Sequence, residues 1–195
     1  MKVLPREFYF RGPDEVAAEL LGKLLVRIYK GRRLSGFIVE TEAYFGPEDP
    51  ASRAKRGGGL AKVMEGEVGL ALVYGVHRKW LLNVVAHEEG GIGAVLIRAI
   101  HPFEGVELMK ELRKVRKIRE LTNGPGKLTE ALAVDKKFHR KPLYLPDSDL
   151  RIERGSYPGA LKVARSHRIG VSEDLPVPYR FYVEGDPYVS KVRPL

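Results

Sequence analysis

The chain has 195 residues, and its 34 Lys and Arg against 25 Asp and Glu give a formal net charge of +9. This length fits one domain, and a hydrophobic fraction of 44% is sufficient for a globular core. The absence of cysteine excludes a disulfide scaffold, a zinc ribbon and a thiol nucleophile. No apolar run is long enough for a membrane span and no signal peptide is evident, so we expect a soluble intracellular protein, cytoplasmic in a prokaryote.

The positive charge favours a polyanionic partner, although a basic solvated surface alone has the same composition. The chain also has two Asn and no Gln beside its many charged residues. Depletion of thermolabile residues together with abundant charge is reported for hyperthermophiles, so the composition indicates a thermophilic source.

The hydrophobic pattern predicts the elements in chain order. Helices are expected at 15–25, 103–120 and 127–134, where apolar residues recur at helical spacing. Strands are expected at 24–29, 37–44, 68–74, 80–85, 94–100 and 179–183, the first two forming a hairpin, while glycine and proline predict a loop over 46–59. Because helices and strands do not alternate, the sequence predicts an α+β fold, with a single domain over 1–195 and a largely antiparallel, curved β-sheet with flanking helices.

Two acidic residues lie close together in the strand predicted at 37–44. Side chains alternate between the faces of a strand, so Glu40, Glu42 and Tyr44 share one face. An unpaired buried carboxylate is costly, which leaves two interpretations. Either Glu42 is a general base at the end of the strand, or both acids are exposed and pair with nearby Lys or Arg.

Arg98 is a lone cation inside the apolar strand predicted at 94–100. A buried guanidinium needs a partner, and Glu40 or Glu42 on an adjacent strand could supply the carboxylate. The resulting ion pair has either a structural or a functional role.

Two further segments carry weaker patterns. Gly124, Gly126 and Lys127 lead into a predicted helix and could bind a phosphate, although the same residues also suit a simple turn. Tyr74 precedes a basic stretch and could insert into a base stack, or it could cover the end of the sheet. The five histidines have no metal-site spacing, so no metal site is expected.

The segment 39–52, VETEAYFGPEDPAS, resembles the alkyladenine (3-methyladenine) DNA glycosylase family, also called methylpurine DNA glycosylase. Further segments match in the same order, at 20–27, 73–75, 83–85, 95–99, 124–128 and 180–183, so the resemblance covers nearly the whole chain. It implies a base-excision repair enzyme that binds double-stranded DNA and flips out a damaged purine, either alkylated or deaminated. A monofunctional glycosylase of this kind hydrolyses the N-glycosidic bond, needs no cofactor and leaves an abasic site.

The resemblance also implies catalytic roles. Glu42 corresponds to the general base that activates water, and Arg98 to the residue that orients both the base and the water. The backbone carbonyl near Ile169 corresponds to a further contact of that water. General base catalysis contributes roughly 10²- to 10⁴-fold to a rate, which gives these residues a plain chemical purpose.

The base pocket implied by the resemblance differs from the family pattern. Tyr44 corresponds to one pocket wall, Tyr74 to the wedge that fills the gap left by the flipped nucleotide, and Asn83 to a pocket-side residue that helps to reject guanine. The family's stacking His is replaced by Arg53, and a second stacking Tyr by Ala71. We therefore predict a changed lesion preference, because a cationic Arg53 would repel a cationic alkylpurine and favour a neutral lesion such as hypoxanthine.

The segment between Tyr74 and Asn83 is two residues longer than in well-known members of the family, so the position of Asn83 in the pattern is less specific. His77 and Trp80 lie in this longer segment, and either could replace a missing pocket wall.

Two other functions compete with a monofunctional glycosylase. A bifunctional glycosylase/lyase would use a Lys nucleophile, and a non-catalytic nucleic-acid-binding module would bind DNA without releasing a base. Glu42 and Arg98 argue against a pure binding module, because a carboxylate facing phosphates does not help binding. A monomer is expected, since one polypeptide can supply both the wedge and the pocket.

Overall fold

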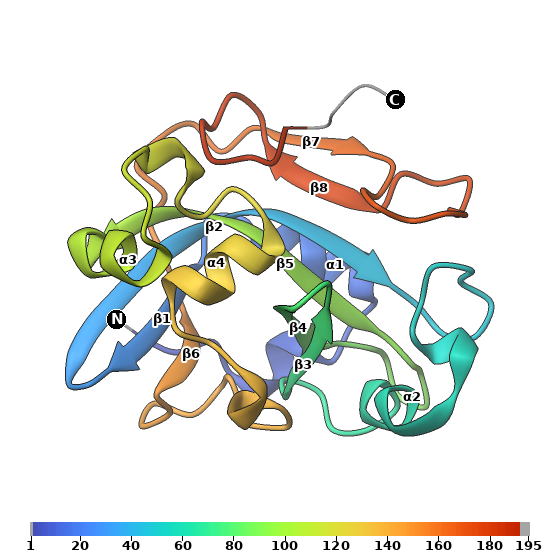
Figure 1. Cartoon of the computed structure of the whole chain (residues 1–195). Helices are drawn as coiled ribbons and strands as arrows, with labels where there is room; N and C mark the ends of the chain where they lie inside the picture. The colour runs from blue at the N-terminus through green and yellow to red at the C-terminus, as the bar shows by residue number, and fades with distance from the viewer. Residues whose placement is uncertain (1, 192–195) are drawn as a thin grey trace.

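The fold is an antiparallel sheet that curls around its longest strand, β2, as Figure 1 shows for the computed structural model of the chain, which describes residues 2–191. The strands are β1 (Leu24–Tyr29), β2 (Arg32–Tyr44), β3 (Ala71–Val76), β4 (Lys79–Val85), β5 (Ala94–Glu104), β6 (Leu150–Glu153), β7 (Val163–Ser166) and β8 (Arg180–Val183). Their order is β3-β4-β5-β2-β1-β6, and β8 joins β2 and β7 joins β8. Each of these strand pairings is antiparallel, which confirms the predicted sheet.

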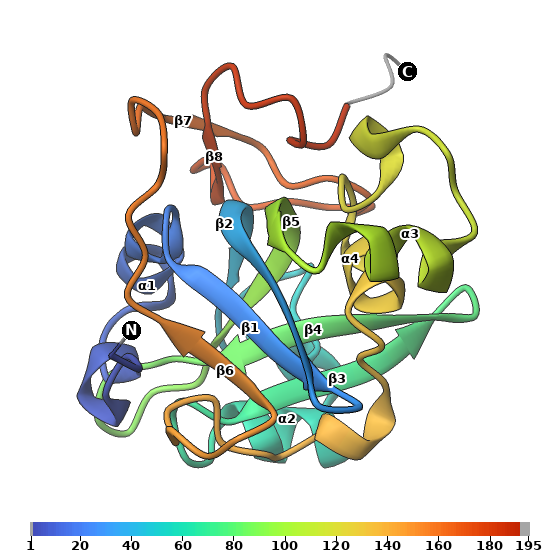
Figure 2. The same ribbon diagram turned by 90° about the vertical axis from the view of Figure 1, so that its left-hand side faces the viewer.

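Helices cover both sides of the sheet. They are α1 (Pro13–Leu20), α2 (Gly58–Met64), α3 (Val106–Arg113) and α4 (Pro125–Ala131), with the short 3-10 helices η1 (Arg6–Tyr9), η2 (Ala54–Arg56), η3 (Ile118–Glu120) and η4 (Lys136–Phe138). In Figure 2, α1 lies on one side of the sheet and α3 and α4 lie on the other, so the predicted α+β class is confirmed. No helix among the described residues has both the length and the apolar character that crossing a membrane requires.

The packing of α1 fixes the end of β2 that carries Glu42. Val16, Ala17 and Leu20 form the buried face of α1, and burying an aliphatic side chain contributes roughly 1.5–3 kcal/mol. The hydroxyl of Thr41 donates a hydrogen bond of 2.8 Å to the carbonyl of Ala17. The functional strand is therefore anchored from behind by both apolar packing and a buried hydrogen bond.

The helix predicted at 103–120 is wrong in extent. β5 continues through Glu104, which pairs with Ser35 of β2, and Gly105 then turns the chain with φ 73°. α3 ends at Arg113 because Lys114 takes a left-handed conformation with φ 53°. Pairing with a neighbouring strand and a left-handed cap thus override the helical spacing that continues in the sequence.

The prediction of an irregular segment over 46–59 is also partly wrong. α2 begins at Gly58, inside the glycine run, and continues to Met64. Met64 is buried in a small apolar cluster with Leu72 and Val85, and this burial stabilises a helix that the local sequence disfavours.

A register shift between β2 and β5 lies at the centre of the molecule. Glu40 is opposite Ala99 and Thr41 is opposite Ile97, so Arg98 stands as an extra residue between two paired positions. Such a bulge bends a strand and changes the direction of its side chain. On its other edge β2 pairs with β8, where Glu42 is opposite Arg180. The two acids therefore lie on the central strand of three, with β5 on one side and β8 on the other.

Candidate active site

Glu42 has a fully buried side chain whose two carboxylate oxygens are both hydrogen-bonded. Oε1 accepts a hydrogen bond of 2.7 Å from the backbone N–H of Ile169. Oε2 accepts bonds of 2.7 Å from the Tyr44 hydroxyl and 3.3 Å from Nη1 of Arg98. The carboxylate is therefore held in one orientation by donors from three parts of the chain.

Glu40 is the second buried acid, so the alternative of two exposed acids does not describe this site. Its Oε1 accepts hydrogen bonds from Nε of Arg98 at 3.0 Å and Nε of Arg180 at 2.7 Å, and Oε2 accepts one of 2.7 Å from the N–H of Ser190. Burial acts to raise the pKa of Glu40, but the two guanidinium groups and these hydrogen bonds outweigh it and lower that pKa. Arg98 thus pairs with both acids rather than with one of them.

Tyr44 is held between Glu42 and a second cation. Burial, and then the neighbouring Glu42 carboxylate, raise the pKa of the Tyr44 hydroxyl well above its ordinary value, so the group remains a donor. The guanidinium carbon of Arg168 lies 4.7 Å from the centre of the Tyr44 ring, a distance typical of a cation–π contact.

A cavity of about 470 Å³ lies beside this cluster, within the size range of small-molecule sites. Among the residues predicted for the site, Tyr44, Arg53, Tyr74, Arg98, Gly126 and Ile169 line it. Tyr44 and Arg98 also contact Glu42, so the buried carboxylate lies one hydrogen bond behind the cavity wall. The guanidinium carbon of Arg53 lies 4.9 Å from the centre of the Tyr74 ring at this cavity.

Comparison with known proteins identifies the family of this chain. Residues 7–187 match the family model described as methylpurine-DNA glycosylase (MPG). The chain belongs to the methylpurine-DNA glycosylase family. This confirms the resemblance seen in the sequence, and with it the prediction of a base-excision repair DNA glycosylase rather than a non-catalytic binding module.

Relatives from archaea and bacteria align over almost their whole length. A protein of Aeropyrum pernix is 47% identical over 98% of this chain and 95% of its own. Proteins of Bacillus subtilis and Methanocella arvoryzae are 44% and 42% identical, over 96% and 100% of this chain and 96% and 98% of their own. All three are provisionally named 3-methyladenine DNA glycosylase.

Asn83 does not line the cavity of this glycosylase, in contrast to its predicted pocket-side position. It is buried on β4 between Leu72 and Leu96, and its side-chain amide donates a hydrogen bond of 3.0 Å to the carbonyl of Leu72. Leu81, two residues earlier on the same strand, lines the cavity instead. The side-chain amide of Asn83 is thus hydrogen-bonded within the sheet, behind the cavity.

The hairpin that carries Tyr74 closes with a tight two-residue turn. His77 and Arg78 occupy the turn with φ 47° and 63°, the left-handed conformations that such hairpins require. His77 lines the cavity, whereas Trp80 packs beside Gly75 and faces a separate depression. Of His77 and Trp80, the two candidates for a replacement pocket wall, His77 lines this cavity and Trp80 does not.

The segment predicted to bind phosphate forms the start of α4. Gly126 lines the cavity beside Glu42, whereas Gly124 and Lys127 line a larger neighbouring cavity. Nζ of Lys127 donates a hydrogen bond of 2.8 Å to the side chain of Asn123. Within residues 2–191 no cluster of three or more His, Asp or Glu side chains is arranged to hold a metal ion.

The structure adds a buried clamp that the sequence did not indicate. The Arg168 guanidinium donates to both carboxylate oxygens of Asp49, at 2.6 and 2.8 Å, and to Asp174 at 2.8 Å. These contacts join the loop after β2 to the loop that carries Ile169. Only the position of Arg168 next to Ile169 could have signalled this role, because its partner Asp49 is 119 residues away.

Proposed function

We propose that Glu42 is the general base with which this glycosylase hydrolyses the N-glycosidic bond of a damaged purine in double-stranded DNA. The observation that carries this proposal is the buried Glu42 carboxylate, which is oriented by three donors that all belong to residues of the cavity wall. Arg98 neutralises part of the surrounding acidic charge and positions the carboxylate. The hydroxyl of Tyr44 donates a hydrogen bond to the Glu42 carboxylate.

The proposed reaction needs only this chain and water. As the bond between C1′ and the purine nitrogen breaks, its electron pair leaves with the base and the sugar becomes cation-like. The Glu42 carboxylate stabilises that positive charge and accepts a proton from the attacking water, whose oxygen forms the new bond to C1′. A cationic lesion leaves as a neutral base, whereas a neutral lesion takes up a proton from solvent as it leaves. Glu42 then returns its proton to solvent, and an abasic site and a free base remain.

The cavity supports extrusion of one base from the duplex. Tyr44 forms one wall, and we assign Tyr74 as the wedge that takes the place of the flipped base, at a stacking gain of roughly 1–3 kcal/mol. Arg53 adds a cation to the wall, which disfavours a cationic alkylpurine and favours a neutral lesion such as hypoxanthine. Alkylated and deaminated purines are both within the proposed substrate class.

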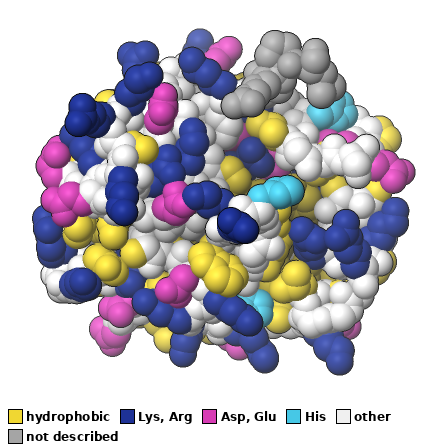
Figure 3. Space-filling model, viewed as in Figure 1, with side chains coloured by type: hydrophobic (Ala, Val, Ile, Leu, Met, Phe, Trp, Pro, Cys, Tyr) yellow, Lys and Arg dark blue, Asp and Glu magenta, His cyan; other side chains and the backbone are white. Residues whose placement is uncertain are grey.

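The positive surface charge supports binding to DNA, and the extent of the family match supports a single domain. Lys and Arg side chains are spread across the face shown in Figure 3, with exposed apolar side chains between them, as suits the phosphates of duplex DNA. The family match over 7–187 supports one glycosylase domain for the whole chain. We propose that a monomer acts on DNA, and that this occurs in the cytoplasm if the source is prokaryotic.

Base release from defined duplexes tests the function. Duplexes with 3-methyladenine, 7-methylguanine or hypoxanthine are incubated with wild-type protein, and the free base and the abasic strand are measured. We expect release without strand cleavage and without a covalent adduct after borohydride treatment. A trapped adduct would support the Lys-dependent lyase, and DNA binding without any release would refute the glycosylase.

A further inference from the structure

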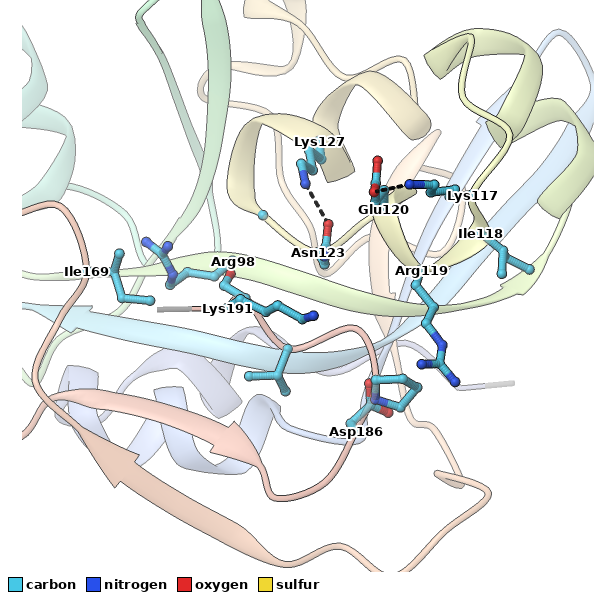
Figure 4. A pocket seen from close by; sticks show the side chains of 14 residues that line it. Arg98, Lys117, Ile118, Arg119, Glu120, Asn123, Lys127, Ile169, Asp186 and Lys191 are labelled. Atoms are coloured by element: carbon cyan, nitrogen blue, oxygen red, sulfur yellow. Dashed lines mark hydrogen bonds and ion pairs between the residues drawn. The ribbon is translucent and has the colours of Figure 1, made fainter. Parts of the chain in front are cut away.

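A second and larger cavity adjoins the cavity of about 470 Å³ proposed to hold the flipped base, which we call the base cavity. It measures about 1120 Å³, and Arg98 and Ile169 line both cavities. One wall comes from residues 117–127 and the other from residues 186–191. We call this cavity the basic groove; Figure 4 shows Arg98 and Ile169 together at one end of it and Arg119 toward the other.

The basic groove carries more cations than its acids can neutralise. Lys117, Arg119, Lys127 and Lys191 line it. Lys117 forms an ion pair of 3.8 Å with Glu120, but both side chains are largely exposed, so the pair leaves much of the charge available to a ligand. Within residues 2–191, neither Arg119 nor Lys191 forms an ion pair.

The other acid that lines the basic groove, Asp186, is hydrogen-bonded to residues other than the cations of the groove. Asp186 is buried, and its Oδ2 accepts hydrogen bonds from Nδ1 of His101 at 2.7 Å and from the Tyr157 hydroxyl at 2.6 Å. Its Oδ1 accepts one of 2.8 Å from the N–H of Tyr188. The carboxylate therefore holds its own wall together, and the positive charges of Arg119 and Lys191 remain available to attract an anion.

The residues that line the basic groove suit a sugar-phosphate backbone rather than nucleobases. Ile118 is 43% exposed, and Pro187 and Val189 add apolar surface that a sugar can contact. No aromatic ring is among the described residues that line the basic groove, so base stacking is not provided there. Cations beside small apolar surfaces recognise phosphates and sugars without regard to sequence.

The wall formed by 186–191 is tied to the catalytic cluster. The N–H of Ser190 donates 2.7 Å to Oε2 of Glu40, and the carbonyl of Ser190 accepts 3.3 Å from Arg180. Glu40 in turn binds Arg98, which binds Glu42. A ligand in the basic groove therefore lies against a wall whose position is set by Glu40 and, through Arg98, is linked to Glu42.

We propose that the basic groove binds the sugar-phosphate backbone of the damaged strand on one side of the flipped nucleotide, with Arg119 and Lys191 as phosphate contacts. This inference rests on the proposed function. The two cavities meet at Arg98 and Ile169, so a strand whose base occupies the first cavity can continue directly into the second. The complementary strand remains outside both cavities.

Neutral phosphates test the inference without requiring catalysis. Dissociation constants are measured for a duplex with a stable abasic analogue, in which single methylphosphonates replace the phosphates next to the lesion. For wild type, we expect weaker binding when the replaced phosphates lie in the damaged strand on one side only. The double variant Arg119→Ala/Lys191→Ala should be insensitive to those replacements and should lower the salt slope of binding by about 1–2.

A matched variant controls for the loss of charge. Arg32 is exposed at the start of β2 and lines neither cavity, so Arg32→Ala should keep the wild-type response to methylphosphonates. Equal sensitivity of wild type and the double variant, or sensitivity confined to the complementary strand, would overturn the inference. If the duplex binds as described but wild type releases no base from damaged DNA, the proposed function fails and the groove assignment stands.

Discussion

The backbone N–H of Ile169 donates a hydrogen bond of 2.7 Å to Oε1 of Glu42, although 127 residues separate the two. Because the donor belongs to the backbone, the orientation of Glu42 depends on the path of a loop and not on the type of side chain at position 169. Arg168 sets that path through its buried contacts with Asp49 and Asp174. The orientation of Glu42, the proposed general base, therefore depends on contacts between segments that lie far apart in the sequence.

Replacing Ile169 separates the backbone donor from the side chain. Ile169→Ala retains the N–H and should retain most base release, whereas Ile169→Pro removes it. Loss of a hydrogen bond to a charged group costs about 1.5–3 kcal/mol, so we expect the proline variant to be slower by roughly ten- to a hundredfold in single turnover. Melting temperatures of both variants show whether the fold persists. Equal rates in folded alanine and proline variants would remove this bond from the mechanism.

Arg98 should be worth far more to stability than an exposed arginine. Arg98→Leu leaves Glu40 and Glu42 buried with one partner fewer, and breaking a buried ion pair costs about 3–5 kcal/mol. Arg11 pairs with Glu19 at the surface, so Arg11→Ala is the matched control and should cost less than about 1 kcal/mol. Denaturant unfolding measures both changes in free energy. Similar costs for the two variants would contradict the buried network.

The stability of the protein should decrease in acid through Glu40. Burial acts to raise its pKa, but Arg98, Arg180 and the Ser190 hydrogen bonds lower it below the ordinary value of 4.5. Since the folded-state pKa is the lower one, the stabilisation is present above pH 4.5 and is lost as the pH falls through the folded-state pKa. Glu40→Gln should lower the melting temperature at neutral pH and weaken its dependence on acid. An unchanged acid dependence in that variant would assign the effect to other carboxylates.

Arg53 should set the ratio of neutral to cationic lesions that are released. Its guanidinium lies on the Tyr74 ring at the base cavity, so Arg53→Ala removes a positive charge from the pocket wall. A repulsion of about 1–2 kcal/mol corresponds to roughly five- to thirtyfold, and we expect 3-methyladenine release to rise by that factor relative to hypoxanthine. Arg56→Ala, an exposed cation of the same cavity, is the control. An unchanged ratio in Arg53→Ala and Arg53→His refutes the role.

The local pattern of β2 was informative because strand geometry is regular. Alternation of side chains predicts that Glu40, Glu42 and Tyr44 share a face, and in the structure the Tyr44 hydroxyl binds Glu42. The need of a buried cation for a carboxylate likewise predicts the partners of Arg98. That both acids would be buried, and would share one guanidinium, depends on the bulge between β2 and β5 and is not visible in the sequence.

Features that depend on distant parts of the chain were not predictable. α3 begins only at Val106 because β5 pairs as far as Glu104, and it stops at Arg113 because Lys114 adopts a left-handed conformation. Asn83 lies behind the cavity because its side-chain amide donates a hydrogen bond to the carbonyl of Leu72 across the hairpin. In both cases the outcome is decided by neighbouring strands, whose positions no local pattern specifies.

The most direct test of the central claim is single-turnover base release by Glu42→Gln. Glutamine keeps the shape of the side chain but cannot accept a proton from water, so we expect release of hypoxanthine to fall by roughly 10²- to 10⁴-fold while binding to lesion DNA is retained. Glu48→Gln, an exposed acid in the loop that follows β2, should release the base at the wild-type rate. Wild-type rates in folded Glu42→Gln would contradict the assignment of Glu42 as the base.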